Sequence, residues 1–85
     1  ADDHTPEAEM MNREIMQTVE AAVARLPEDL RRAITLREME GLSYDEIAQI
    51  MDCPIGTVRS RIFRAREVIA KDLRPLLDTS ENQRW

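Results

Sequence analysis

The chain has 85 residues, a formal net charge of −5, one cysteine and one histidine, which corresponds to a single small domain. A lone cysteine excludes an internal disulfide and a metal site built on cysteine pairs, so we expect no metal and no other cofactor. No apolar run approaches the roughly 18 residues that cross a bilayer, and no signal-peptide pattern opens the sequence. We therefore expect a soluble intracellular protein or a fragment of one.

The composition favours helices. Glu, Ala, Arg, Leu, Ile and Met dominate, whereas the chain has only two glycines, one phenylalanine and one tyrosine, so a sheet protein is not indicated. We predict an all-α fold, a four-helix domain over residues 6–77. Residues 1–5 are expected to be a linker from an upstream region, and residues 78–85 a disordered tail.

Prolines mark the first two helices. Thr5 can cap a helix that has Pro6 at its first position, and apolar residues then recur at intervals of three or four along the sequence. Pro27 ends this helix and opens a second one, which Gly41 terminates because glycine accepts a left-handed backbone. The second helix is expected to bury Leu30, Ala33, Ile34 and Met39.

A capping box begins the third helix. The Ser43 hydroxyl can accept a hydrogen bond from one free backbone amide, while the Glu46 side chain reaches back to another. We expect this helix to be short. Its inward-facing residues are predicted to be Ile47, Ala48, Ile50 and Met51.

The fourth helix is expected from about Ile55 to Arg74, because Pro75 disfavours helix in the residue ahead of it. A short capped helix, a tight turn at 52–54 and a longer arginine-rich helix together form a helix-turn-helix pattern. The pattern spans about residues 43–73, and no wing accompanies it.

Charge is unevenly distributed along the chain. Residues 1–30 carry −6, whereas residues 57–74 carry +4. This segregation suggests an anionic partner for the fourth helix.

The fourth helix has an apolar side and a polar side. At about 100° per residue, one side of this helix collects apolar residues and must be core. These residues are Val58, Ile62, Ala65, Ile69 and Leu73. The other side holds an aromatic side chain among arginines. In a DNA major groove, a phenyl edge can pack on a thymine methyl while an arginine bonds guanine O6 and N7. The candidate base-reading residues are Arg59, Ser60, Phe63 and Arg64.

A second group of residues is placed to bind phosphates. Two arginines lie at the edges of the buried stripe, where they suit the DNA backbone better than the bases. Glycine at the start of the fourth helix allows a sugar-phosphate backbone to approach closely. The candidate DNA-backbone contacts are Arg37, Ser43, Tyr44, Gly56, Thr57, Arg61 and Arg66.

Simpler structural roles are open for several of these residues. Gly56 can merely relieve crowding at a turn, Ser43 can act only as a cap, and Tyr44 can cover the core. Phe63 can belong to a satellite core. Cys53 is best explained as a small buried residue of the turn.

The sequence contains no catalytic motif. It has no glycine-rich phosphate loop and no Ser, His and Asp set suited to nucleophilic catalysis. Its carboxylates are better explained as solvated helix charges. We therefore expect no enzymatic activity and no small-molecule substrate.

One continuous segment carries a family resemblance. Residues 26–67 read LPEDLRRAITLREMEGLSYDEIAQIMDCPIGTVRSRIFRARE, with a Leu-Pro-Glu start, a Gly-Leu-Ser-Tyr junction and a Cys-Pro-Ile-Gly-Thr-Val-Arg-Ser-Arg run. This segment resembles region 4 of extracytoplasmic-function (ECF) sigma factors, which are specificity subunits of bacterial RNA polymerase. It is most similar to the group that includes sigma-E and the alginate regulator.

The resemblance implies a domain that binds the promoter −35 element, with a GGAAC-like core, as duplex DNA and that also holds the polymerase β-flap. It implies that the base-reading residues are the four already named, Arg59, Ser60, Phe63 and Arg64. It also implies contacts to the DNA backbone at Arg37, Ser43, Tyr44, Thr57 and Arg66. A membrane-bound anti-sigma factor is a further implied partner, so the protein is expected in the bacterial cytoplasm and at the inner membrane when that factor binds. Region 2 of sigma factors is not in this sequence, so the chain alone is not expected to start transcription.

Two other functions stay open. One is the DNA-binding domain of another regulator, such as a response regulator. Such domains usually dimerise through a further helix, but no spare apolar stripe is found here, so we expect a monomer. The other is a protein-interaction module whose arginines meet an acidic partner, such as an anti-sigma factor, rather than DNA.

Overall fold

The computed structural model describes residues 6–82, which form four helices and no strand. These are α1 (Pro6–Arg25), α2 (Glu28–Glu38), α3 (Tyr44–Met51) and α4 (Ile55–Asn82). The prediction of an all-α, four-helix fold is confirmed. Within the described residues, no helix has the length and apolar character that spanning a membrane requires.

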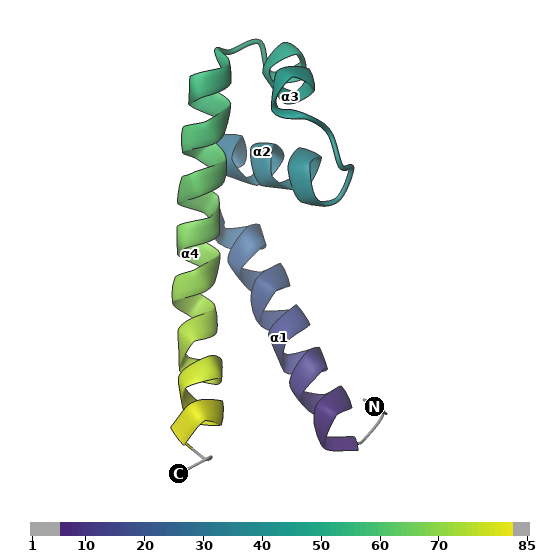
Figure 1. Ribbon diagram of the computed structural model, residues 1–85, viewed down its shortest axis with the longest axis vertical. Helices are drawn as coiled ribbons and strands as arrows, with labels where there is room; N and C mark the ends of the chain where they lie inside the picture. Colours follow the sequence, from purple (N-terminus) through teal and green to yellow (C-terminus); the bar gives the residue numbers. More distant parts are fainter. Residues whose placement is uncertain (1–5, 83–85) are drawn as a thin grey trace.

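The long helix α4 contacts each of the other three helices. α2 and α3 lie beside its first half, whereas α1 runs along its second half and diverges from it towards the N-terminus (Figure 1). No described helix covers the left-hand side of α4 in this view. α3 and the first turns of α4, which form the helix-turn-helix, therefore lie at one end of the molecule, and one side of α4 stays uncovered (Figure 1).

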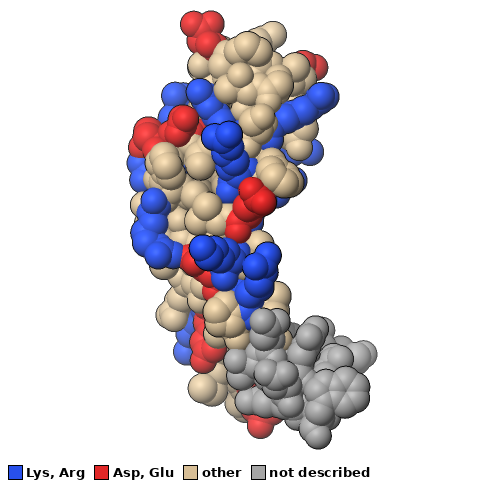
Figure 2. Space-filling view, turned by 90° about the vertical axis from the view of Figure 1, so that its left-hand side faces the viewer, with Lys and Arg blue, Asp and Glu red and all other residues tan. Residues whose placement is uncertain are grey.

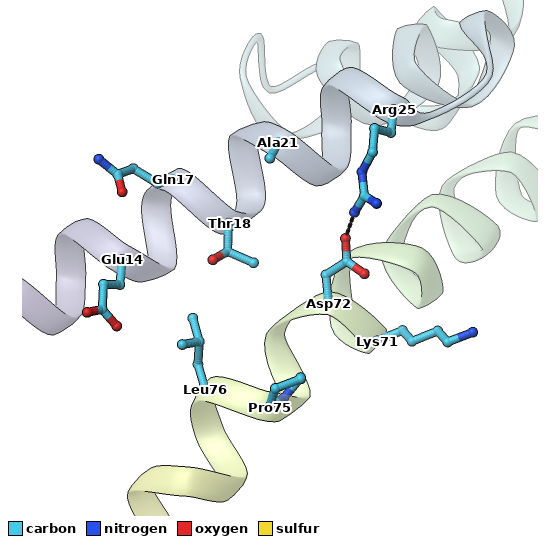
Figure 3. Close-up of a pocket in the computed structure, with 9 residues that line it drawn as sticks. All are labelled: Glu14, Gln17, Thr18, Ala21, Arg25, Lys71, Asp72, Pro75 and Leu76. Atoms are coloured by element: carbon cyan, nitrogen blue, oxygen red, sulfur yellow. Dashed lines mark hydrogen bonds and ion pairs between the residues drawn. The ribbon is translucent and has the colours of Figure 1, made fainter.

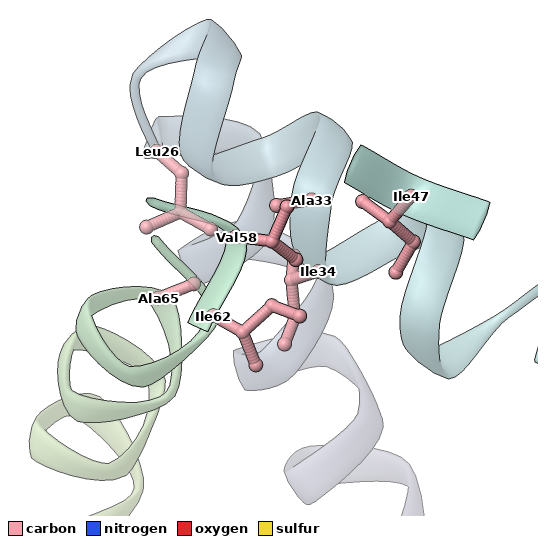
Figure 4. Packing of buried hydrophobic residues seen from close by; sticks show 7 residues of the cluster. All are labelled: Leu26, Ala33, Ile34, Ile47, Val58, Ile62 and Ala65. Carbon is pink, nitrogen blue, oxygen red and sulfur yellow. The ribbon is translucent and has the colours of Figure 1, made fainter. Parts of the chain in front are cut away.

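A small apolar core fixes the rotation of α4 about its own axis. Val58, Ile62 and Ala65 are almost fully buried, as their helical spacing predicts. They pack with residues of α2 and α3 (Figure 4), and no polar or charged side chain among the described residues is buried. The core consists of Leu26, Ala33, Ile34, Ile47, Val58, Ile62 and Ala65.

Two residues expected in the core are exposed. Met39 is 81% exposed and Ile50 is 50% exposed, so both predictions are wrong. Met39 follows the last residue of α2, where the helix ends. On the short helix α3, Ile47 is buried and Ala48 and Met51 pack beside it. Ile50 lies about 100° from the middle of that stripe, because each residue advances the helix by about 100°.

Local signals at the helix ends are confirmed. Ser43 Oγ accepts a hydrogen bond from the backbone N–H of Glu46 at 3.1 Å, and the backbone N–H of Ser43 donates to Glu46 Oε1 at 2.9 Å. The bond from the Ser43 backbone holds the pKa of the Glu46 carboxyl below its ordinary value of 4.5. Gly41 has a φ of 69°, as its place after α2 predicts. Asp52, with a φ of 53°, ends α3 in a left-handed conformation that was not predicted.

Ser43→Ala is expected to lower the free energy of unfolding by about 1 kcal/mol, because the N–H of Glu46 loses its acceptor. Ser43→Thr is the matched control, since it keeps a hydroxyl at the N-cap. Urea unfolding followed by circular dichroism measures both variants. Equal stability of the alanine and threonine variants would contradict the capping role.

The end of α4 differs from the prediction. The helix does not stop at Arg74 but continues to Asn82, with Pro75 inside it. Residues 78–82, expected in a disordered tail, are therefore helical in their backbone. Thr5, the expected linker 1–5 and residues 83–85 lie outside the described residues.

Contacts with α1 explain why the helix passes through Pro75. A proline inside a helix removes one backbone hydrogen bond and disfavours the helix. Before Pro75, Asp72 forms an ion pair with Arg25 of α1. After it, the half-buried Leu76 points into the groove between the two helices (Figure 3). The segment is thus held against α1 on both sides of the proline.

Candidate nucleic-acid interface

The four predicted base-reading residues share the solvent face of α4. Arg59, Ser60, Phe63 and Arg64 are all exposed, and Phe63 is exposed over 63% of its surface. Phe63 is therefore not a core residue, which removes that alternative. The face opposite to them is buried, so the packing of α4 itself turns this set outward.

A shallow hollow lies beside these residues at the start of α4. It has a volume of about 390 Å³. A Cβ atom added at Gly56 would meet no atom within 4 Å, so this glycine does not relieve crowding inside the chain. The bare backbone instead leaves room for an anion at the start of the helix. The hollow is lined by Asp29, Leu30, Gly56, Thr57, Ser60, Arg61 and Arg64.

The ring of Tyr44 connects α2 with α4. It is half-buried against the core, and the guanidinium carbons of Arg37 and Arg59 lie 4.9 Å and 5.9 Å from the ring centroid. Arg37 also donates from Nη1 to the carbonyl oxygen of Leu42 at 2.8 Å. Cation–π contacts of this kind restrict where an arginine can point. Tyr44 therefore covers the core and positions two arginines, an arrangement that the sequence did not indicate.

Arg61 and Arg66 reach back towards α2. Arg61 Nε lies 3.5 Å from Asp29 Oδ2, and its Nη1 donates to Cys53 Sγ at 3.7 Å. Arg66 Nη2 donates to Glu38 Oε1 at 2.5 Å, and this hydrogen bond raises the pKa of the Arg66 guanidinium. Sequence reasoning placed both arginines at the edges of the buried stripe but missed their carboxylate partners. Cys53 is partly buried in the turn.

The remaining candidate, Ser43, is exposed beside Tyr44 at the start of α3. Figure 2 shows the face of the molecule that α4 presents, where Lys and Arg side chains gather over the upper and middle parts with Asp and Glu side chains among them. Within residues 6–82, no group of His, Cys, Asp and Glu side chains could hold a metal ion. The arrangement is thus a locally basic helix face with an exposed phenyl ring.

Comparison with known proteins decides the family. The family described as sigma-70, region 4 matches residues 16–69, which include α2, α3, the turn and the first half of α4. The chain belongs to this sigma factor region 4 family. The predicted resemblance is confirmed, and the response-regulator alternative has no support.

Several sigma factors are similar to this region 4 chain, each at 62% identity. They include the ECF RNA polymerase sigma-E factor of Haemophilus influenzae, over 73 residues, and the RNA polymerase sigma-H factor of Pseudomonas aeruginosa, over 76 residues. The ECF sigma-E factor of Escherichia coli K12 matches over 72 residues. These matches cover 86%, 89% and 85% of this chain but only 39%, 39% and 38% of the relatives. The chain therefore spans about two fifths of the length of these relatives.

Proposed function

We propose that this region 4 binds the −35 element of promoters as duplex DNA. Within a longer sigma factor, it would thereby direct RNA polymerase to those promoters. The observation that carries the proposal is the exposed set Arg59, Ser60, Phe63 and Arg64 on one face of α4. An α-helix fits the major groove, where arginine pairs with guanine and a phenyl edge with a thymine methyl.

Contacts to the DNA backbone would set the position of α4 in the groove. The start of α4 at Gly56 and Thr57 offers an unobstructed backbone to one phosphate. Arginines around the Tyr44 ring and at the edges of the core stripe supply positive charge to others. The proposed backbone contacts are Arg37, Ser43, Tyr44, Gly56, Thr57, Arg61 and Arg66.

The proposed partners follow from the family. They are double-stranded promoter DNA, the β-flap of RNA polymerase and a membrane-bound anti-sigma factor. The protein would act in the bacterial cytoplasm as a monomeric transcription initiation factor rather than as an enzyme. It would be held at the inner membrane when the anti-sigma factor binds it.

Fluorescence anisotropy with labelled duplexes tests DNA recognition by the 85-residue chain. We expect tighter binding to a duplex with a GGAAC-like core than to a scrambled duplex of equal composition. We also expect the affinity for both duplexes to fall as the salt concentration rises. A plot of the logarithm of the affinity against the logarithm of the salt concentration should have a negative slope of several units, because phosphate contacts release counterions. Equal affinities for the two duplexes would contradict base reading.

An interaction module for an anti-sigma factor is the second candidate, favoured by an open groove between α1 and the second half of α4 (Figure 3). The groove has a volume of about 630 Å³, and apolar side chains such as Ala21 and Leu76 lie beside charged ones such as Glu14 and Lys71. Binding of an anti-sigma factor without any salt-sensitive DNA binding would favour this function over the first.

A further inference from the structure

The arginines on the first half of α4 fall into two classes. Arg61 and Arg66 each form an ion pair with a carboxylate of α2, at 3.5 Å from Asp29 and 2.5 Å from Glu38. Within the described part of the chain, neither Arg59 nor Arg64 has such a pair. The charge that α4 offers to DNA is therefore not uniform.

The two carboxylates stand at opposite ends of α2. Asp29 lies in its first turn and Glu38 is its last residue, and α2 packs across the buried face of α4. Because α2 crosses α4, one of its ends reaches Arg61 and the other reaches Arg66. The acids thus pair with the two arginines that flank the core stripe and not with Arg59 or Arg64.

The Arg66–Glu38 pair is open to solvent, and the Arg61–Asp29 pair is open on the side of Asp29, whereas the Arg61 side chain is half-buried. The side chains of Arg66 and Glu38 are each about half exposed, and that of Asp29 is also about half exposed. Exposed pairs of this kind are weak and can exchange partners. A DNA phosphate that approaches either arginine must therefore compete with the carboxylate already there, and the carboxylate itself repels the phosphate.

We propose that Asp29 and Glu38 are positioning residues that hold down the affinity of this interface for the DNA backbone by neutralising Arg61 and Arg66. The inference rests on the proposed function, since it concerns the same DNA-binding face. Because Arg61 and Arg66 are paired with carboxylates, they contribute less to DNA affinity than unpaired arginines would. A larger share of the affinity therefore comes from the base contacts of Arg59 and Arg64. The effect is local and separate from the overall charge of −5, because salt screens distant charges.

Glu38→Gln tests the proposal, since it keeps the size of the side chain and removes its charge. We expect this variant to bind both the GGAAC-like and the scrambled duplex about two- to five-fold more tightly than the unsubstituted chain, as releasing an exposed ion pair allows. We also expect its log–log salt slope to steepen by about one unit, because Arg66 is freed to neutralise a phosphate.

Two controls separate this effect from a change in net charge. Glu20→Gln removes one negative charge from an exposed position on α1 and is expected to leave the salt slope unchanged. When Arg66 is replaced by Gln, Glu38→Gln is expected to raise the affinity for DNA by no more than Glu20→Gln does. Thermal unfolding of each variant verifies that it is folded. Asp29→Asn with Arg61→Gln repeats the test at the other end of α2.

The inference is overturned if Glu38→Gln gains no more affinity than Glu20→Gln. It is also overturned if the gain persists in full without Arg66, because Glu38 would then not act through that arginine. Failure of the proposed function gives a different result, in which the unsubstituted chain shows no preference for the GGAAC-like duplex. The same titrations distinguish the two failures.

Discussion

Arg64→Ala is expected to weaken binding to the GGAAC-like duplex by about 1–3 kcal/mol, the discrimination that a bidentate arginine–guanine pair provides. Arg64 is exposed on the outward face of α4, next to the hollow at the helix start, and no described carboxylate pairs with it. Its guanidinium is therefore free to meet a base edge. The loss is expected to be much smaller on the scrambled duplex.

Arg74→Ala is the matched control for this prediction. Arg74 is an exposed arginine of the same helix, but it lies ten residues further on, about 15 Å along the axis at 1.5 Å per residue. Its removal is expected to change affinity for the two duplexes little and equally. Anisotropy titrations at one salt concentration measure both variants. Base reading by Arg64 is refuted if its removal weakens binding to both duplexes by the same amount.

Ile62→Ala is expected to lower the free energy of unfolding by about 2–5 kcal/mol, the usual range for a buried isoleucine. Ile62 is a residue of α4 and is almost fully buried against the helices that cover this face of α4 (Figure 4). Natural domains have stabilities of about 0.05–0.15 kcal/mol per residue, so this loss is a large part of the total for a small domain. The same side chain fixes which face of α4 points outward.

Ile50→Ala is the matched control, because it makes the same chemical change at a half-exposed position of α3. It is expected to cost less than about 1 kcal/mol, since surface substitutions have small effects. Urea unfolding followed by circular dichroism gives both values. Similar losses for the two variants would mean that the core around Ile62 does not hold α4 in place.

Features of the fold that depend on neighbours in sequence could be predicted. The capping box at Ser43 and Glu46, the left-handed Gly41 and the buried stripe of α4 are all local patterns, and the structure contains each of them. Features that depend on contacts between helices could not. The path of α4 through Pro75 relies on its packing against α1, and no local pattern reports that contact.

The candidate site also has features that the sequence predicts and features that depend on contacts between helices. Helical spacing alone placed Phe63 and Arg64 on the outward face, and both are exposed. The stacking of Arg59 on Tyr44 brings together two helices, as does the pairing of Arg66 with Glu38. Such pairs are set by how α2 and α3 cross α4, so sequence spacing gave no sign of them.

The proposed function depends most on Arg64, which is expected to bind guanine in the major groove. Replacing one guanine of the GGAAC-like core at a time with 7-deazaguanine removes the N7 acceptor and leaves base pairing intact. At one of the two guanines, we expect the substitution to weaken binding of the unsubstituted chain. It should not weaken binding of Arg64→Ala any further, because that variant has already lost the contact. Equal losses for both proteins at each guanine, or no loss for either, would contradict this expectation.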